Sequence, residues 1–156
     1  MLYNTLALPY FNYGVTIWGH SYAKNISKIV RIQKKIVRII TFSAYLEHTE
    51  NLFKSHNILK FKSLYDYFTL IFMYNYKHGM LPSSFDTFFI PNNHIHKYQT
   101  RNAIKYRTKY CSSLITSFSI QKMGPSIWNA LPNTVKESKS LSIFKRRLKL
   151  HLIESQ

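Results

Sequence analysis

The sequence has 156 residues, of which 46% are hydrophobic and 16% aromatic. This is enough apolar material for a folded domain, and it argues against disorder. Lysine and arginine number 22 against 6 acidic residues, for a formal net charge of +16. Such a surplus attracts polyanions such as nucleic acid or an anionic membrane. The single cysteine, Cys111, excludes an internal disulfide scaffold and a Cys-based zinc site.

Neither a membrane span nor a secretory signal is predicted. No apolar run approaches the roughly 18 residues that a spanning helix needs. At the start of the chain no basic segment precedes a small-residue cleavage site. We therefore expect an intracellular protein with no transmembrane segment, and the sequence leaves nucleus or cytoplasm open.

The first segment, from Leu2 to Trp18, is apolar and aromatic, with Pro9 in its middle and Gly14 and Gly19 as breakers. Proline kinks or ends a helix, and glycine favours a turn. The segment predicts a short helix, a kink, and a second short helical or extended piece.

From Tyr22 to Phe42 the periodicity is that of an amphipathic helix. Apolar residues recur at steps of three and four and share one face: Ile26, Ile29, Val30, Ile36, Val37 and Ile40. Basic residues recur at the same steps on the opposite face: Lys24, Lys28, Arg31, Lys35 and Arg38.

Two further helices follow. Thr49 is placed to cap a short helix that runs to about Lys54 and ends at Asn57. A long helix from about Ser63 to Lys77, closed by Gly79 and Pro82, is almost wholly apolar or aromatic. We expect this long helix to be the centre of the core.

The remainder predicts a loop-rich segment and two helices. Residues 82–113 form an irregular connection anchored by Phe85, Phe88 and Phe89. Pro125 is placed in the first turn of a short helix that runs to Trp128. Ser140 caps a last helix with a buried stripe of Leu141, Phe144, Leu148 and Leu152. The predicted fold is mainly α, a single irregular helical domain over residues 1–156, loop-rich around 82–124.

No catalytic constellation is present. The acidic residues are scattered, whereas two-metal phosphoryl transfer needs clustered carboxylates. His94 and His96 could ligate a metal from a strand, but no third ligand lies nearby, so an ordinary loop is favoured. No phosphate-binding glycine loop or nucleophile motif occurs. We expect no enzyme activity, no metal and no cofactor.

Basic residues gather in three clusters, at 24–38, 97–109 and 136–149, with Glu137 as their single acid. Each cluster could be a solvent-exposed helix face with no binding role. Such a face normally carries acidic residues four positions from its basic residues, so that the two form supporting pairs. The second cluster includes Tyr98 and Tyr106 and is followed directly by Tyr110, and these tyrosines suit base stacking. The predicted contacts to RNA or DNA are Lys24, Lys28, Arg31, Lys35, Arg38, Arg101, Lys105, Arg107, Lys109, Lys145, Arg146 and Arg147.

A second interpretation remains open. A basic amphipathic helix also fits an acidic protein partner or an anionic membrane surface. Trp18 and Trp128 each lie beside glycine or proline in apolar stretches. Core packing or the anchoring of a turn is favoured for both over ligand stacking.

An ordered set of short phrases extends over nearly the whole chain. Near the start it includes Pro9-Tyr10, Trp18-Gly19 and Gln33-Lys34-Lys35 within the basic helix. The middle has Leu52-Phe53-Lys54, Ile58-Leu59, Phe72-Met73-Tyr74 and Leu81-Pro82, and the end has Gly124-Pro125, Trp128-Asn129, Leu131-Pro132 and Ser140-Leu141. The set resembles the C-terminal region of reverse transcriptases from non-LTR (LINE-like, jockey-type) retrotransposons, after the palm and thumb.

This resemblance implies a parent RNA-directed DNA polymerase encoded by a transposable element, which copies element RNA at a nicked chromosomal target. The family's paired-aspartate palm motif and its endonuclease have no counterpart in this sequence, so no catalytic residue carries over. Asn51 stands where the family often has proline. The resemblance implies a non-catalytic helical fragment that binds nucleic acid, with RNA, DNA and the parent polymerase domain as partners.

Overall fold

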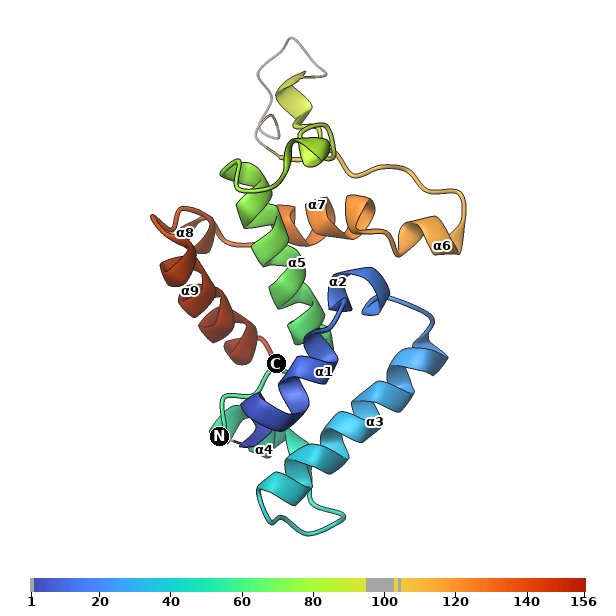
Figure 1. The fold of residues 1–156 in the computed structure, drawn as a ribbon, viewed down its shortest axis with the longest axis vertical. Coiled ribbons are helices and arrows are strands. Elements are labelled where there is room, and N and C mark those ends of the chain that lie inside the picture. Colours follow the sequence, from blue (N-terminus) through green and yellow to red (C-terminus); the bar gives the residue numbers. More distant parts are fainter. Residues whose placement is uncertain (1, 95–102, 104) are drawn as a thin grey trace. The chain divides into compact units, whose positions relative to one another are not determined.

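The computed structural model describes residues 2–94, 103 and 105–156. This part of the chain holds nine α-helices, two 3₁₀ turns, one π-helical turn and an isolated bridge between Pro91 and Tyr106 (Figure 1). The prediction of a mainly α fold is confirmed. Contacts group the chain into two compact units, Met1–Tyr67 with Leu148–Gln156, and Phe68–Arg147. The assignment of 1–156 to one domain stays a prediction.

The first unit opens with three short helical elements: η1 (Tyr3–Ala7), α1 (Leu8–Asn12) and α2 (Val15–Trp18). A short helix, a kink and a second short piece were expected here, and the chain turns at Gly14, one of the two expected breakers, where φ is +60°. Pro9 lies in the first turn of α1, where a missing N–H costs little. The Trp18 indole N–H donates to the Tyr13 carbonyl at 2.6 Å and anchors this turn, as predicted.

The amphipathic helix is α3 (Ala23–Ile40), which packs against η1 and α4 (Thr49–Ser55). Its extent agrees with the prediction. Thr49 does not cap α4: it is a buried first helical residue, and His48 occupies the cap position. Asn57 follows α4 with φ of +53°, the left-handed conformation that ends a helix.

The long apolar helix is α5 (Phe61–Lys77), which begins two residues before the predicted start at Ser63. It contributes buried residues to both units: Phe61, Leu64 and Tyr65 in the first, and Thr69, Leu70, Met73 and Tyr74 in the second. Gly79, with φ of +63°, ends it as expected. The prediction of a core helix is confirmed.

In the second unit, the aromatic anchors of the irregular segment form one cluster. Two 3₁₀ turns, η2 (Ser83–Phe85) and η3 (Asn92–His94), interrupt this segment. The Phe72 ring lies 5.5 Å from Phe85 and 6.3 Å from Phe89, and the Phe89 ring lies 4.8 Å from Tyr76. Phe89 is buried, so the predicted anchoring role is confirmed.

The helices after this segment differ from the expected ones. The structure has α6 (Leu114–Ser117), α7 (Ile120–Ala130) and α8 (Asn133–Lys136). The prediction that Pro125 begins a helix is wrong, because α7 starts five residues earlier and encloses it. Gly124 and Pro125 are both buried. Tertiary packing of this helix therefore outweighs the local cost of an internal proline.

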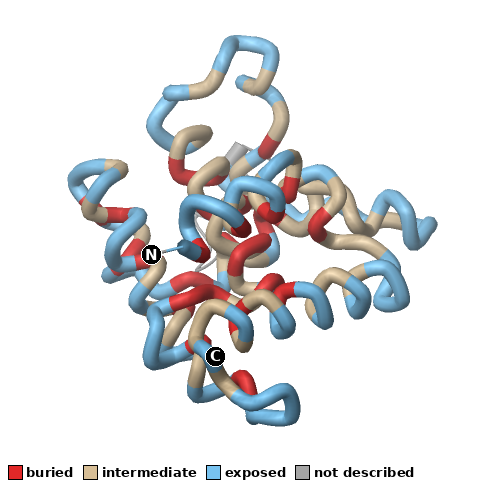
Figure 2. The backbone as a smooth tube through the Cα atoms, turned by 60° about the horizontal axis from the view of Figure 1, so that its bottom comes forward, coloured by how far each residue is buried: buried red, intermediate tan, exposed pale blue. Residues whose placement is uncertain are grey.

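The last helix, α9 (Leu141–Glu154), begins as predicted, since the Ser140 hydroxyl accepts the Ile143 N–H at 3.3 Å. Phe144, Leu148 and Leu152 are buried. In the second unit the Phe144 ring lies 4.4 Å from Tyr74. Buried positions alternate with exposed ones along the helices, the pattern of amphipathic packing (Figure 2).

Candidate nucleic-acid interface

The basic face of α3 is a row of exposed side chains. Lys24, Lys28, Arg31 and Lys35 are all exposed, one or two turns apart, while Gln33 and Val37 bury the opposite face. We call these four residues the α3 row. Arg38 was predicted to belong to it but is half-buried, with its Nε donating to the Glu47 carbonyl at 3.0 Å.

The charges of the α3 row have no acidic counterpart. Among the described residues, the ion pair that joins a lysine or arginine to a carboxylate is Lys60 with Glu50, at 3.3 Å. No charge on the α3 row is offset by such a pair. The row thus keeps four positive charges on one side of one helix, which is a geometry suited to a phosphate backbone.

The second basic cluster is described in part. Lys105, Arg107 and Lys109 are exposed, and Arg101 lies outside the described residues, as do Tyr98 and His96. Lys109 donates to the Gln121 side chain at 3.0 Å.

Two tyrosines of this cluster differ in their availability for stacking. Tyr110 is 95% exposed and therefore available to a base. Tyr106 is half-buried, with its ring 5.9 Å from Tyr76 and 6.1 Å from Phe89. It is part of the packed aromatic cluster and not the open platform that was expected.

In the third cluster, the three bases in the first half of α9, Lys145, Arg146 and Arg147, are exposed. The Arg147 guanidinium donates to the Thr134 carbonyl at 3.0 Å, which leaves its charge at the surface. The second cluster and the three bases Lys145, Arg146 and Arg147 belong to the second unit, whereas the α3 row belongs to the first.

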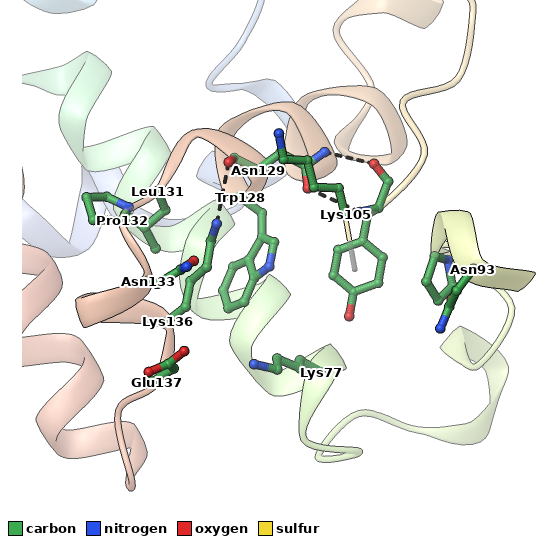
Figure 3. A pocket seen from close by; sticks show the side chains of 12 residues that line it. Lys77, Asn93, Lys105, Trp128, Asn129, Leu131, Pro132, Asn133, Lys136 and Glu137 are labelled. Carbon is green, nitrogen blue, oxygen red and sulfur yellow. Dashed lines mark hydrogen bonds between the residues drawn. The ribbon is translucent and has the colours of Figure 1, made fainter. Parts of the chain in front are cut away.

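A pocket of about 610 Å³ in the second unit was not expected from the sequence. Its walls include Lys77 at the end of α5, Lys105, Trp128 of α7 and Lys136 of α8, and we call it the lysine pocket. Lys77 and Lys136 both lie beside the Trp128 indole (Figure 3). The Lys77 ammonium is 6.0 Å from the centre of the Trp128 ring, within reach of a cation–π interaction.

Trp128 is 4% exposed and its ring centre lies 6.1 Å from that of Phe144, so the predicted packing role is confirmed. In the sequence, the Trp128-Asn129 phrase is the feature that could have indicated this pocket. The side-chain amide of Asn129 holds Tyr106 on the pocket wall. Asn129 Oδ1 accepts the Tyr106 N–H at 3.1 Å, and its Nδ2 donates to the Tyr106 carbonyl at 2.8 Å.

An apolar groove of about 480 Å³ lies in the first unit, lined by residues of η1, α1 and α3. Its lining is wholly apolar or aromatic: Leu6, Ala7, Tyr10, Phe11, Ile32, Ile36, Ile39 and Ile40. Leu6, Tyr10 and Ile39 are more than 60% exposed. Ile32 and Ile39 are on the flank of α3 that adjoins the α3 row, so apolar surface and positive charge meet along this helix.

The acidic residues form no metal site in the part of the chain that the structure describes, where no three His, Cys, Asp or Glu side chains gather. Burial raises the pKa of Asp66 to about 6, against a smaller opposing effect of the nearby Lys62 charge. This pKa shift comes from burial of a single carboxyl group and not from a carboxylate pair.

Of the helices in the described residues, none has both the length and the apolar character required to span a bilayer. Comparison with protein-family models, with curated proteins and with solved structures finds no match.

Proposed function

We propose that this chain binds the phosphate backbone of RNA or DNA, with the α3 row as its main contact. The observation that carries the proposal is the set of four exposed basic side chains on one helix face, none offset by a carboxylate of the described residues. Unrelieved repulsion on such a face is a cost to the free protein, and bound phosphates remove it.

The exposed bases of the other two clusters extend this proposal to the second unit. Lys105, Arg107 and Lys109 together with Lys145, Arg146 and Arg147 supply further phosphate contacts. Tyr110, almost fully exposed beside Lys109, supplies a surface on which a base of a single strand can stack.

The sequence resemblance indicates the larger protein in which this binding would take place. We infer that the chain is a non-catalytic piece of a non-LTR retrotransposon reverse transcriptase, in which it holds template RNA or target DNA for the polymerase. The exposed apolar groove supports this inference, because it would be covered by the parent polymerase domain.

The first test is RNA binding by the purified chain, with helicity followed by circular dichroism. Six neutralised phosphates on a single strand give a slope of log affinity against log salt near −4, from about −0.7 per phosphate. Changing Lys28, Arg31 and Lys35 to Glu is expected to abolish most of the binding and to leave helicity unchanged. Binding that does not depend on salt would overturn the electrostatic proposal.

The origin of the chain has its own test. Translation of the locus upstream of the Met1 codon is expected to reveal an aromatic residue followed by paired aspartates, the polymerase motif. An unrelated promoter and leader there would show an independent gene. Primer extension by the isolated chain would contradict the non-catalytic assignment.

A second candidate function is docking on an acidic protein or an anionic membrane. The observation that favours it is the apolar groove beside the α3 row, because an amphipathic acidic surface would fill the groove and neutralise the row. This alternative predicts that anionic vesicles bind at least as tightly as RNA of equal charge. It also predicts that Ile39→Ser weakens vesicle binding and spares RNA binding.

A further inference from the structure

The lysine pocket brings together positive charges from three separate parts of the second unit. Lys77 comes from the end of α5, Lys105 from the segment that follows the described 3₁₀ turns, and Lys136 from α8. Among the described residues of the wall Glu137 is the one carboxylate, and no ion pair joins it to any of the three ammonium groups. The wall therefore carries a surplus of two positive charges around a volume of about 610 Å³.

The three lysines affect one another. The pKa of Lys136 is lowered first by its burial, and further by the charges of Lys105 and Lys77. Lys136 makes one hydrogen bond, of 3.4 Å, to the Asn129 carbonyl. Like charges held around a common space repel one another, and an anion placed among them turns that repulsion into attraction.

The wall that carries Lys105 is held by backbone hydrogen bonds. The Asn92 N–H donates to the Lys105 carbonyl at 3.0 Å, and the Arg107 N–H donates to the Ile90 carbonyl at 2.9 Å. The two bonds between the Asn129 amide and the Tyr106 backbone fix the same segment to α7. A pocket with a pre-formed wall loses less conformational entropy on binding than loose surface lysines would.

The rest of the lining is mixed, with aromatic and apolar side chains beside the amides of Asn93, Asn129 and Asn133. Tyr106 and Trp128 face the pocket, and Leu131 and Pro132 complete this side. Volumes of 300–1,000 Å³ with apolar walls and a few convergent polar groups are typical of small-molecule sites. A ligand that fits the pocket has anionic groups for the lysines and an organic part that contacts the apolar and amide side chains.

We propose that the lysine pocket binds a nucleotide through its phosphate groups. The nucleotide is either a free nucleoside triphosphate or the triphosphate-bearing 5′ end of an RNA strand, which present the same chemistry. This site goes beyond the backbone contacts of the α3 row and uses none of its residues, and it shares only Lys105 with the further phosphate contacts proposed above.

The test is calorimetric titration of the full chain with three probes: ATP, inorganic tripolyphosphate and adenosine. ATP and tripolyphosphate are expected to bind, and adenosine to bind at least tenfold more weakly. Adenosine that binds as tightly as ATP would overturn the proposal, since the phosphates would then contribute nothing.

Single substitutions locate the binding. Lys136→Met and Lys105→Gln should each weaken ATP binding about tenfold, the loss expected when a charge-assisted hydrogen bond is removed. Lys122→Gln, on α7 but not on the pocket wall, is the control and should bind like the wild type. Because Lys105 is exposed, its replacement keeps the test informative if the half-buried Lys136 is needed for folding. Wild-type affinity in both pocket variants would overturn the proposal.

Two further measurements separate the sources of the ligand and the two proposals. An RNA with a 5′-triphosphate that displaces ATP better than the same RNA with a 5′-hydroxyl identifies a strand end, and equal displacement identifies the free nucleotide. The Lys28, Arg31 and Lys35 triple variant should lose RNA binding yet retain ATP binding. Loss of both RNA binding and ATP binding in that variant would assign ATP binding to the α3 row and overturn the proposal for the lysine pocket.

Discussion

The side-chain amide of Gln33 accepts a hydrogen bond from the backbone N–H of Phe61, with 2.8 Å between the two atoms. The same amide donates to the Leu59 carbonyl at 2.9 Å and to the Tyr3 hydroxyl at 2.8 Å. Gln33 is 1% exposed. One polar side chain of α3 therefore satisfies the start of α5 and joins it to the first residue of η1.

Gln33→Leu is expected to lower the free energy of unfolding by roughly 2–4 kcal/mol, because each buried polar group left without a partner costs about 1–3 kcal/mol. Urea unfolding measures the loss. Lys34→Leu, at the adjacent exposed position, is the control and should change stability by less than about 0.5 kcal/mol. Equal losses in the two variants would contradict the role of the Gln33 hydrogen bonds.

Asp66 makes stability depend on pH. Its pKa is raised by burial to about 6 from an ordinary value of 3.8, so the folded chain holds the proton more tightly than the unfolded chain. The resulting stabilisation is complete below pH 3.8 and is lost as the pH rises to about 6. At a difference of about two pKa units, the loss is on the order of 2–3 kcal/mol.

His20 changes the pH dependence of stability in the opposite direction, because burial, aided by the Lys62 charge, lowers the pKa of its imidazole. A comparison of the wild type with Asp66→Asn separates the effect of the Asp66 carboxyl group from that of His20. The variant is expected to be more stable than the wild type at pH 7 and to lose this advantage at pH 4, as measured by urea unfolding at both values. A stability difference that stays constant with pH would contradict the raised pKa of Asp66.

Gly124 is the point of close approach between α7 and α5. A Cβ at this position would lie 2.9 Å from the Met73 Sδ and 3.4 Å from the Phe89 ring, and Met73 is fully buried. Gly124→Ala should destabilise the chain by about 1–2 kcal/mol, since overpacking outweighs the gain in helix propensity. In a Met73→Ala background the same change should be neutral or stabilising, and a double-mutant cycle with no coupling would refute the contact.

Neutralising the α3 row gives a quantitative prediction for binding. Changing Lys28, Arg31 and Lys35 to Gln should reduce the magnitude of the salt slope for single-stranded RNA by about 2. The matched control changes Lys54, Lys62 and Lys122 to Gln, which removes the same net charge outside the three basic clusters. If both triple variants lower the slope equally, the affinity follows total charge and not the α3 row.

Much of the helical fold could be predicted because its signals are local. The steps of three and four in α3 set its faces, and Ser140 and Gly79 mark a helix start and a helix end. Gln33 could not be assigned to the core, because a polar residue among lysines reads as surface until its partners are known.

The candidate site was predictable only where it lies on one element. The α3 row follows from the spacing of Lys24 to Lys35, whereas Lys77 and Lys136 are 59 residues apart and share a pocket only through tertiary packing. Pro125 misled the prediction of α7 for the same reason, since α7 encloses this proline where Gly124 and Pro125 are both buried by tertiary packing.

The placement of the two tryptophans has an experimental consequence. Trp18 belongs to the first unit, with its ring centre 5.6 Å from that of Phe61, and Trp128 belongs to the second, on the wall of the lysine pocket. As these are the two tryptophans of the chain, each unit carries one tryptophan, whose emission can be excited apart from that of the tyrosines. Emission from Trp18→Phe and Trp128→Phe variants thus follows the melting of each unit separately, and quenching of Trp128 reports pocket occupancy without any added label.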